Sequence, residues 1–134
     1  MTPLAIHFRR TGVSVGATLE APAVTASGDL AIAWDGRIDN REECAARAGI
    51  TPADLVELTD EALLLRTYER LGTDALADVV GDYAFALWDR RERALFCVRD
   101  PLGQRPLFYY LSASSFIAAS SVAGVLAHPE VPRA

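Results

Sequence analysis

The most informative stretch of the chain for its architecture is Gly81-Asp82-Tyr83-Ala84-Phe85-Ala86-Leu87-Trp88-Asp89. Successive side chains of a β-strand point to opposite faces, so Tyr83, Phe85 and Leu87 share one face. The other face carries the alanines between them together with Trp88. Because both faces are apolar, this pattern predicts a strand that is covered on two sides. The large residues suit packing against a helix, and the alanines allow a second sheet to come close.

Apolar stretches separated by turn signals predict antiparallel hairpins on both sides of this strand. The polar run at residues 90–93 is typical of a turn, and residues 94–98 form the returning strand. Upstream, residues 30–34 predict a strand that ends at Asp35-Gly36, a pair that favours tight hairpin turns. Further hairpins are expected over residues 4–15 and 106–119.

Helical periodicity and capping residues predict helices between these strands. A first helix begins at the cap residue Asn40, and a second covers residues 59–71. A short helical turn capped by Thr73-Asp74 and a closing helix over residues 121–126 complete the set. Strands and inserted helices in this order predict a single layered α+β domain over residues 1–134.

Composition and charge exclude several classes of function. The chain has 134 residues, of which 51% are hydrophobic and 23% are charged, and its net charge is −5. This acidic balance argues against binding to nucleic acids or to anionic membranes. No apolar run approaches the roughly 18 residues that a membrane helix needs. All 13 basic residues are arginine, which excludes Schiff-base chemistry and a P-loop lysine within the chain.

Two cysteines and two histidines give neither a metal-binding nor a disulfide pattern. Cys44 lies in a predicted helix and Cys97 in a predicted strand, so both are expected to be small buried hydrophobic residues. We therefore expect a reduced, cytoplasmic protein with no metal and no cofactor in this domain.

Five motifs resemble the glutaminase domain of asparagine synthetases, a class II glutamine amidotransferase with the N-terminal-nucleophile (Ntn) fold. The strand Gly81–Asp89 resembles a strand of that family, and Arg99-Asp100-Pro101-Leu102-Gly103-Gln104-Arg105-Pro106-Leu107 resembles its Arg-Asp-x-x-Gly-x-x-Pro-Leu loop. The other three are Asp35-Gly36-Arg37-Ile38-Asp39-Asn40, Thr59-Asp60-Glu61-Ala62-Leu63 and Ser120-Ser121-Val122-Ala123. They resemble the family's Asn-Gly-Glu-Ile-Tyr-Asn, Ser/Thr-Asp-x-Glu and Ser-Glu-x-Lys segments. The resemblance covers about residues 28–132 and implies an Ntn-hydrolase-like, four-layer αββα sandwich with two mainly antiparallel sheets.

The resemblance places the family's glutamine pocket on four residues of this chain. Asp35 stands where the family has its oxyanion-hole Asn, and a carboxylate there would repel the developing negative charge. Gly36 is retained, although the predicted turn explains it fully. Arg37 replaces the Glu that helps to hold glutamine, which reverses the charge. Asp60 matches the Asp that holds the ammonium of glutamine, and it also suits the first turn of a helix. We call these four residues the vestigial glutamine pocket.

The family's nucleophile has no clear counterpart. Active members begin with a Cys whose thiol attacks the side-chain amide of glutamine, with its own α-amino group as the base. This chain begins Met1-Thr2-Pro3, so Thr2 is the residue that removal of Met1 would expose as a nucleophile. The arginine that clamps the glutamine carboxylate is also missing. We therefore expect no catalytic residue in this domain.

The loop after residue 98 is expected to have a structural role. Arg99 and Asp100 are adjacent opposite charges at a strand end, which favours hydrogen bonds and a salt bridge that hold the loop. Gly103 and Pro106 belong to the same loop motif, and we expect them to have a structural role as well.

These features predict a catalytically degenerate glutamine amidotransferase-like domain of an asparagine synthetase-like, ATP-dependent amide-forming ligase. The resemblance to β-lactam synthetases and lasso-peptide cyclases implies that it is a scaffold or interface for an ATP-pyrophosphatase synthetase domain. That domain is expected downstream or on a separate chain, and it alone would bind ATP and Mg. Neither nucleic acid nor membrane is an expected partner, and a homodimer is left open. Two alternatives remain: an active glutaminase that supplies ammonia, and a stand-alone module that binds a small molecule or a peptide.

Overall fold

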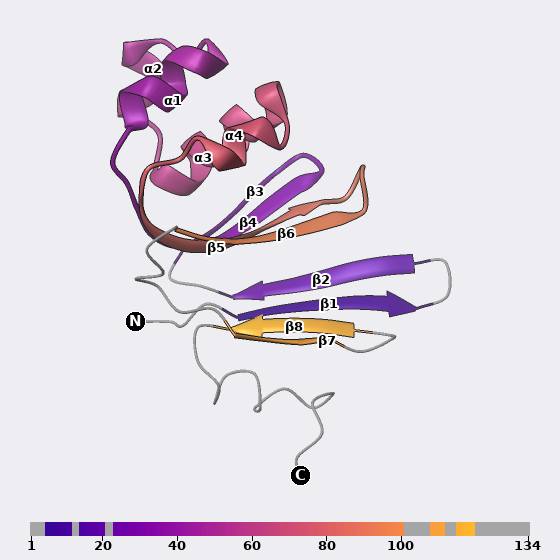
Figure 1. Cartoon of the computed structure of the whole chain (residues 1–134). Helices are drawn as coiled ribbons and strands as arrows, with labels where there is room; N and C mark the ends of the chain where they lie inside the picture. Colours follow the sequence, from indigo (N-terminus) through magenta and orange to yellow (C-terminus); the bar gives the residue numbers. More distant parts are fainter. Residues whose placement is uncertain (1–4, 12–13, 21–22, 101–107, 112–114, 120–134) are drawn as a thin grey trace.

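In a computed structural model, the described part of the chain forms two antiparallel four-stranded sheets and a group of helices (Figure 1). The structure describes residues 5–11, 14–20, 23–100, 108–111 and 115–119. One sheet has the order β3-β4-β5-β6, with bounds Ala23–Ser27, Leu30–Ile38, Gly81–Asp89 and Ala94–Arg99. The other has the order β2-β1-β8-β7, with bounds Ser14–Glu20, Ala5–Thr11, Ser115–Ala119 and Phe108–Leu111. The helices are α1 (Arg41–Ala48), α2 (Pro52–Val56), α3 (Asp60–Leu71) and α4 (Asp74–Ala77).

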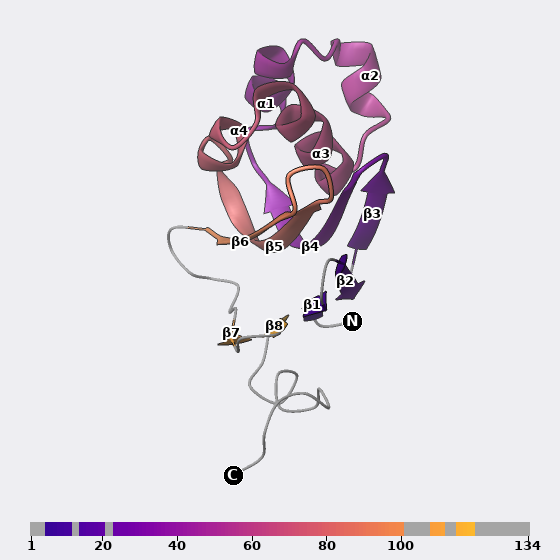
Figure 2. The ribbon, with the colours of Figure 1, turned by 90° about the vertical axis from the view of Figure 1, so that its right-hand side faces the viewer.

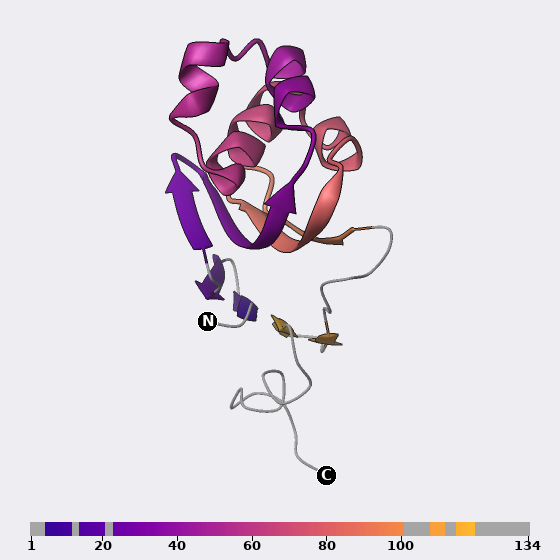
Figure 3. The ribbon, with the colours of Figure 1, turned by 90° about the vertical axis from the view of Figure 1, so that its left-hand side faces the viewer.

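The elements are arranged in layers. The four helices cover one face of the β3-β4-β5-β6 sheet, and the second sheet lies on its opposite side (Figures 2 and 3). This arrangement confirms the predicted α+β class. The helices and the two sheets are three of the four layers of the expected αββα sandwich. The predicted closing helix over residues 121–126 lies outside the described residues.

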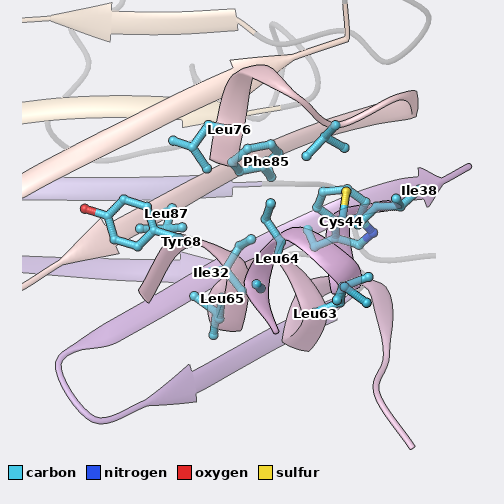
Figure 4. Close-up of a cluster of buried hydrophobic side chains, with 14 of the residues drawn as sticks. Ile32, Ile38, Cys44, Leu63, Leu64, Leu65, Tyr68, Leu76, Phe85 and Leu87 are labelled. Atoms are coloured by element: carbon cyan, nitrogen blue, oxygen red, sulfur yellow. The ribbon is translucent and has the colours of Figure 1, made fainter. Parts of the chain in front are cut away.

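The strand β5 is covered on both faces, as its alternation predicts. Tyr83, Phe85 and Leu87 belong to the buried core that β4 and β5 share with the helices, and Figure 4 shows part of this core. Ala84 and Ala86, on the opposite face of β5, are completely buried. Their small side chains leave room for a second layer at this face.

Aromatic side chains reinforce the pairing of β4 with β5. The two strands are antiparallel, with Trp34 opposite Phe85 and Ile32 opposite Leu87. The Trp34 ring stacks on the rings of Tyr83 and Phe85, with centroids 5.7 Å and 5.5 Å away. Cross-strand aromatic contacts of this kind stabilise a sheet beyond the burial of their area.

The predicted turn at Asp35-Gly36 is wrong, because β4 continues through both residues to Ile38. Gly36 lies opposite Tyr83 in the ladder and has a φ of 146°. A Cβ at this position would lie 2.1 Å from the carbonyl oxygen of Asp82. Glycine is therefore required by the close approach of β5, since no side chain fits between the two backbones.

Two helix predictions also need correction. Asn40 precedes α1 at the N-cap position, but its side chain makes no capping hydrogen bond. Its Nδ2 donates to the carbonyl of Asp78 at 2.9 Å, and its Oδ1 accepts from the backbone N–H of Val80 at 2.9 Å. Asn40 therefore holds the segment between α4 and β5 against the start of α1. The helix α2, which begins with Pro52 after its cap Thr51, was not predicted at all.

Candidate functional site

The candidate site lies where the end of β4 meets the first residue of α3. Asp60 begins α3, and its Oδ2 accepts a hydrogen bond from the backbone N–H of Ile38 at 3.1 Å. Its Oδ1 forms an ion pair with Nη1 of Arg41. The side chains of Asp60 and Arg41 are only 20% and 27% exposed. Both oxygens of the Asp60 carboxylate therefore have partners within the chain.

Arg41 is held in place from several directions. It is the first residue of α1, and its Nη2 donates to the carbonyls of Leu58 at 2.7 Å and Leu55 at 3.2 Å. One guanidinium thus joins α1 to the start of α3, to α2 and to the segment that follows α2. A planar guanidinium can donate several hydrogen bonds in fixed directions, so this position suits arginine better than lysine.

Sequence reasoning missed Arg41. The chain separates it from Asp60 by 18 residues, and only the packing of α1 against α3 brings the two side chains together. Its position directly after the motif Asp35-Gly36-Arg37-Ile38-Asp39-Asn40 was the one available signal.

The other residues of the vestigial glutamine pocket lie along β4. Asp35 and Arg37 share one face of this strand, and Gly36 lies between them on the other. Asp35 is half-buried, opposite Ala84 of β5. The Arg37 side chain is 72% exposed, and its Nε donates to Oδ1 of Asp39 at 2.9 Å. The structure therefore places Asp60 against the backbone of Ile38, whereas Arg37 pairs with Asp39.

Neither cysteine has the environment of a nucleophile. Cys44 is buried in α1, where its burial raises the pKa of the thiol. Cys97 lies in β6, where burial raises its pKa to about 12. Both side chains are therefore neutral thiols at physiological pH, and only the thiolate is strongly nucleophilic. Cys44 is buried, as expected, whereas Cys97 is only half-buried. Thr2 lies outside the described residues.

The start of the loop after β6 is bound to β5. Asp100 is buried, and its backbone N–H donates to the carbonyl of Tyr83 at 2.9 Å. Its Oδ1 accepts from the backbone N–H of Tyr83 at 3.4 Å. These contacts join the start of the loop to β5. Gly103 and Pro106 lie outside the described residues. Arg99 ends β6 and is exposed.

Within the described residues, no group of three His, Cys, Asp or Glu side chains could hold a metal ion. No helix in this part of the chain is long and apolar enough to cross a membrane.

The chain has a fold of the Ntn-hydrolase-like class. Two solved structures share the fold at 16% sequence identity. One is the glutamine phosphoribosylpyrophosphate amidotransferase from B. subtilis complexed with ADP and GMP, with a TM-score of 0.60 over 90% of this chain and 36% of that chain. The other is described as the allosteric regulatory enzyme of purine biosynthesis, with a TM-score of 0.58 over 92% of this chain and 37% of that chain.

Sequence comparison narrows this class to one family. Residues 4–134 match the family model described as "Glutamine amidotransferase domain", and the chain belongs to this family as a domain of the asparagine synthetase type. Asparagine synthetase [glutamine-hydrolyzing] 3 of Bacillus subtilis is 31% identical over 93% of this chain and 20% of the relative. A putative asparagine synthetase [glutamine-hydrolyzing] 2 of Methanocaldococcus jannaschii is 32% identical over 77% of this chain and 19% of the relative. The chain thus spans about a fifth of the length of these relatives.

Proposed function

We propose that this chain is a glutamine amidotransferase domain that no longer hydrolyses glutamine and that acts as a scaffold for an ATP-dependent, amide-forming synthetase domain. The observation that carries the proposal is the ion pair of Asp60 with Arg41. By resemblance, Asp60 is the residue that would hold the ammonium of glutamine. Here a guanidinium of the same chain already neutralises that carboxylate, so an incoming ammonium would have to displace a fixed partner.

The neighbouring charges support the same conclusion. Hydrolysis of an amide passes through an oxyanion, which needs hydrogen-bond donors directed at it. By resemblance, Asp35 occupies the family's donor position with a carboxylate side chain. The loss of one such donor costs roughly 3–4 kcal/mol of transition-state stabilisation, before any repulsion is counted. Arg37, in place of a glutamate, pairs with Asp39 and adds no acidic ligand.

The retained fold supports a scaffold role. The Gly36 close approach and the contacts of Asp60 and Asp100 all preserve the shape of the domain, although the residues resembling a glutamine site are altered. The relatives are named as whole asparagine synthetases, of which this chain matches about a fifth. We infer that the partner is a synthetase domain that takes an amine of its own substrate in place of ammonia, as in the β-lactam synthetase and lasso-peptide cyclase types.

Calorimetry with glutamine tests the role of Asp60. We expect no saturable heat with the wild-type chain, because Arg41 already occupies the carboxylate. Asp60→Asn should instead lower the free energy of unfolding by about 1–2 kcal/mol, since it leaves Arg41 partly buried without its ionic partner. The matched control is Asp74→Asn, an exposed acid at the first position of α4. Saturable glutamine binding that Asp60→Asn abolishes would contradict the proposal.

A second candidate function is a working glutaminase that supplies ammonia. The names of the relatives, which include "glutamine-hydrolyzing", favour this function. The two functions differ in the nitrogen source of the whole protein. A working glutaminase would allow glutamine to support amide formation, whereas the degenerate domain requires an amine and gains nothing from glutamine. Amide formation followed by mass spectrometry, with glutamine or with ammonium chloride, separates the two.

A further inference from the structure

A cavity of about 580 Å³ lies at the opposite end of α3 from Asp60. It opens between the last turn of α3, the turn that joins β3 to β4 and the hairpin that joins β5 to β6. Because α3 has 12 residues and rises about 1.5 Å per residue, roughly 15 Å separates Asp60 from this cavity. Its volume lies within the range of small-molecule pockets, roughly 300–1,000 Å³. The cavity is therefore a separate feature from the vestigial glutamine pocket.

The lining of the cavity is strongly acidic. Asp29, Glu69, Asp89 and Glu92 contribute carboxylates, and among the described residues that line the cavity Arg91 is the only cation. Arg91 lies beside Asp29, with Nη2 3.5 Å from Oδ2. The last turn of α3 also directs backbone carbonyls toward this end of the helix, which adds partial negative charge. An anionic ligand would be repelled here and a cation attracted.

An apolar surface accompanies the acidic groups. The rings of Tyr68 and Phe96 lie 5.8 Å apart at their centroids and are tilted by 56°. Leu30 and Ala94 also line the cavity. Aromatic faces attract organic cations and also pack against the methylene groups that carry them. The combination suits a cation on an apolar stem better than a hydrated metal ion.

Hydrogen bonds hold this site together before any ligand binds. The Tyr68 hydroxyl donates to Oδ2 of Asp89 at 2.7 Å, which ties α3 to the end of β5. The Oδ1 of Asp89 accepts from the backbone N–H groups of Arg91 at 3.0 Å and Glu92 at 3.2 Å. The N–H of Arg90 donates to the carbonyl of Asp29 at 2.9 Å and joins the two hairpin ends. A ligand would thus meet a preorganised surface, which lowers the entropic cost of binding.

We propose that this cavity binds an organic cation, an ammonium or guanidinium group on an apolar stem. The charged group faces Glu69 and Glu92 at the exposed rim, and the stem lies against Tyr68 and Phe96. Asp89 is occupied by its own hydrogen bonds and acts as a positioning residue for the rim. The cation belongs either to a free small molecule or to a side chain of a partner protein, and the test distinguishes these sources.

Titration calorimetry of the purified chain tests the proposal with two probes. Agmatine represents a free cation, and an acetylated, amidated Gly-Arg-Gly peptide represents a protein side chain. We expect saturable binding of at least one probe and at least about tenfold weaker binding in the double variant Glu69→Gln and Glu92→Gln, because two charge-assisted contacts are lost. Glu57→Gln, an exposed acid outside the cavity, is the matched control and should bind as the wild type does.

Each result has a defined meaning. Preference for agmatine identifies a free ligand, and preference for the peptide identifies a partner side chain. Weaker binding of 4-guanidinobutyrate, in which a carboxylate replaces the aminomethyl group of agmatine, is expected from the acidic rim. The proposal is overturned if neither probe binds, or if the double variant, with an unchanged urea midpoint, binds as tightly as the wild type. Because Asp60 is not part of this cavity, none of these results depends on the fate of glutamine hydrolysis.

Discussion

No residue with a Cβ fits at position 36, because the backbone of β5 lies directly against Gly36. An alanine Cβ would be 2.1 Å from the Asp82 carbonyl oxygen and 2.5 Å from Cα of Tyr83. We predict that Gly36→Ala lowers the free energy of unfolding by at least about 3 kcal/mol, since two paired strands must move apart. The measurement is a urea denaturation midpoint with a shared m-value.

Gly28→Ala is the matched control for that substitution. Gly28 also has a positive φ, 58°, but no atom lies within 4 Å of its added Cβ. We expect a cost of only about 1 kcal/mol, which is the backbone penalty alone. Equal losses at the two positions would contradict the steric explanation of Gly36.

The buried hydroxyl of Tyr68 makes a pH-dependent contribution to stability. Burial, the hydrogen bond to Asp89 and the negative charges of Asp89 and Glu92 raise the pKa of Tyr68 to about 12. The folded state therefore holds this proton more tightly than the unfolded state, whose tyrosine pKa is about 10. The resulting stability is complete below about pH 10 and is lost as the pH rises toward about 12.

Tyr68→Phe is predicted to show two effects. Near neutral pH it lowers the free energy of unfolding by about 1–3 kcal/mol, because Asp89 loses a buried donor. Between about pH 10 and about pH 12 its urea midpoint falls less steeply than that of the wild type, because the titrating hydroxyl is gone. Parallel pH profiles for the two proteins would show that the Tyr68 proton is not coupled to folding.

At the scale of secondary-structure elements, the two threonines that precede α3 and α4 differ in one hydrogen bond. The Thr59 hydroxyl accepts from the backbone N–H of Ala62 at 3.3 Å, whereas Thr73 makes no side-chain capping bond to α4. The sequence pattern predicted a cap at Thr73-Asp74, whereas for the longer helix it predicted only a start near residue 59. Thr59→Ala should cost about 1 kcal/mol of stability in urea denaturation. Thr73→Ala should change it by less than about 0.5 kcal/mol, and a reversed order would refute this assignment.

The elements that could be predicted are those specified by local patterns. The period-two alternation of β5 and the helical spacing of α3 both survive in the structure, because tertiary packing follows the same apolar faces. The turn predicted at Asp35-Gly36 is wrong because β5 pairs with β4 along its entire length. This pairing overrides the local turn preference. The helix cap predicted at Asn40 is wrong for a similar reason, since its amide binds the segment before β5.

At the scale of the whole molecule, the candidate site depends on contacts that no local pattern encodes. Asp60 could be identified by resemblance, but its partner Arg41 becomes visible only when α1 packs against α3. The acidic cavity was even less predictable, because the residues that line it come from three segments between residues 27 and 96. The chain therefore combines a recognisable amidotransferase fold with charged contacts that only its tertiary packing creates.

The most direct test of the proposed loss of activity is glutamate release from glutamine by the whole protein that carries this domain. We predict a rate equal to the uncatalysed background at saturating glutamine, because Asp35 opposes an oxyanion and Arg41 occupies Asp60. Release above background that disappears in Asp60→Asn would contradict the prediction and establish a working glutaminase.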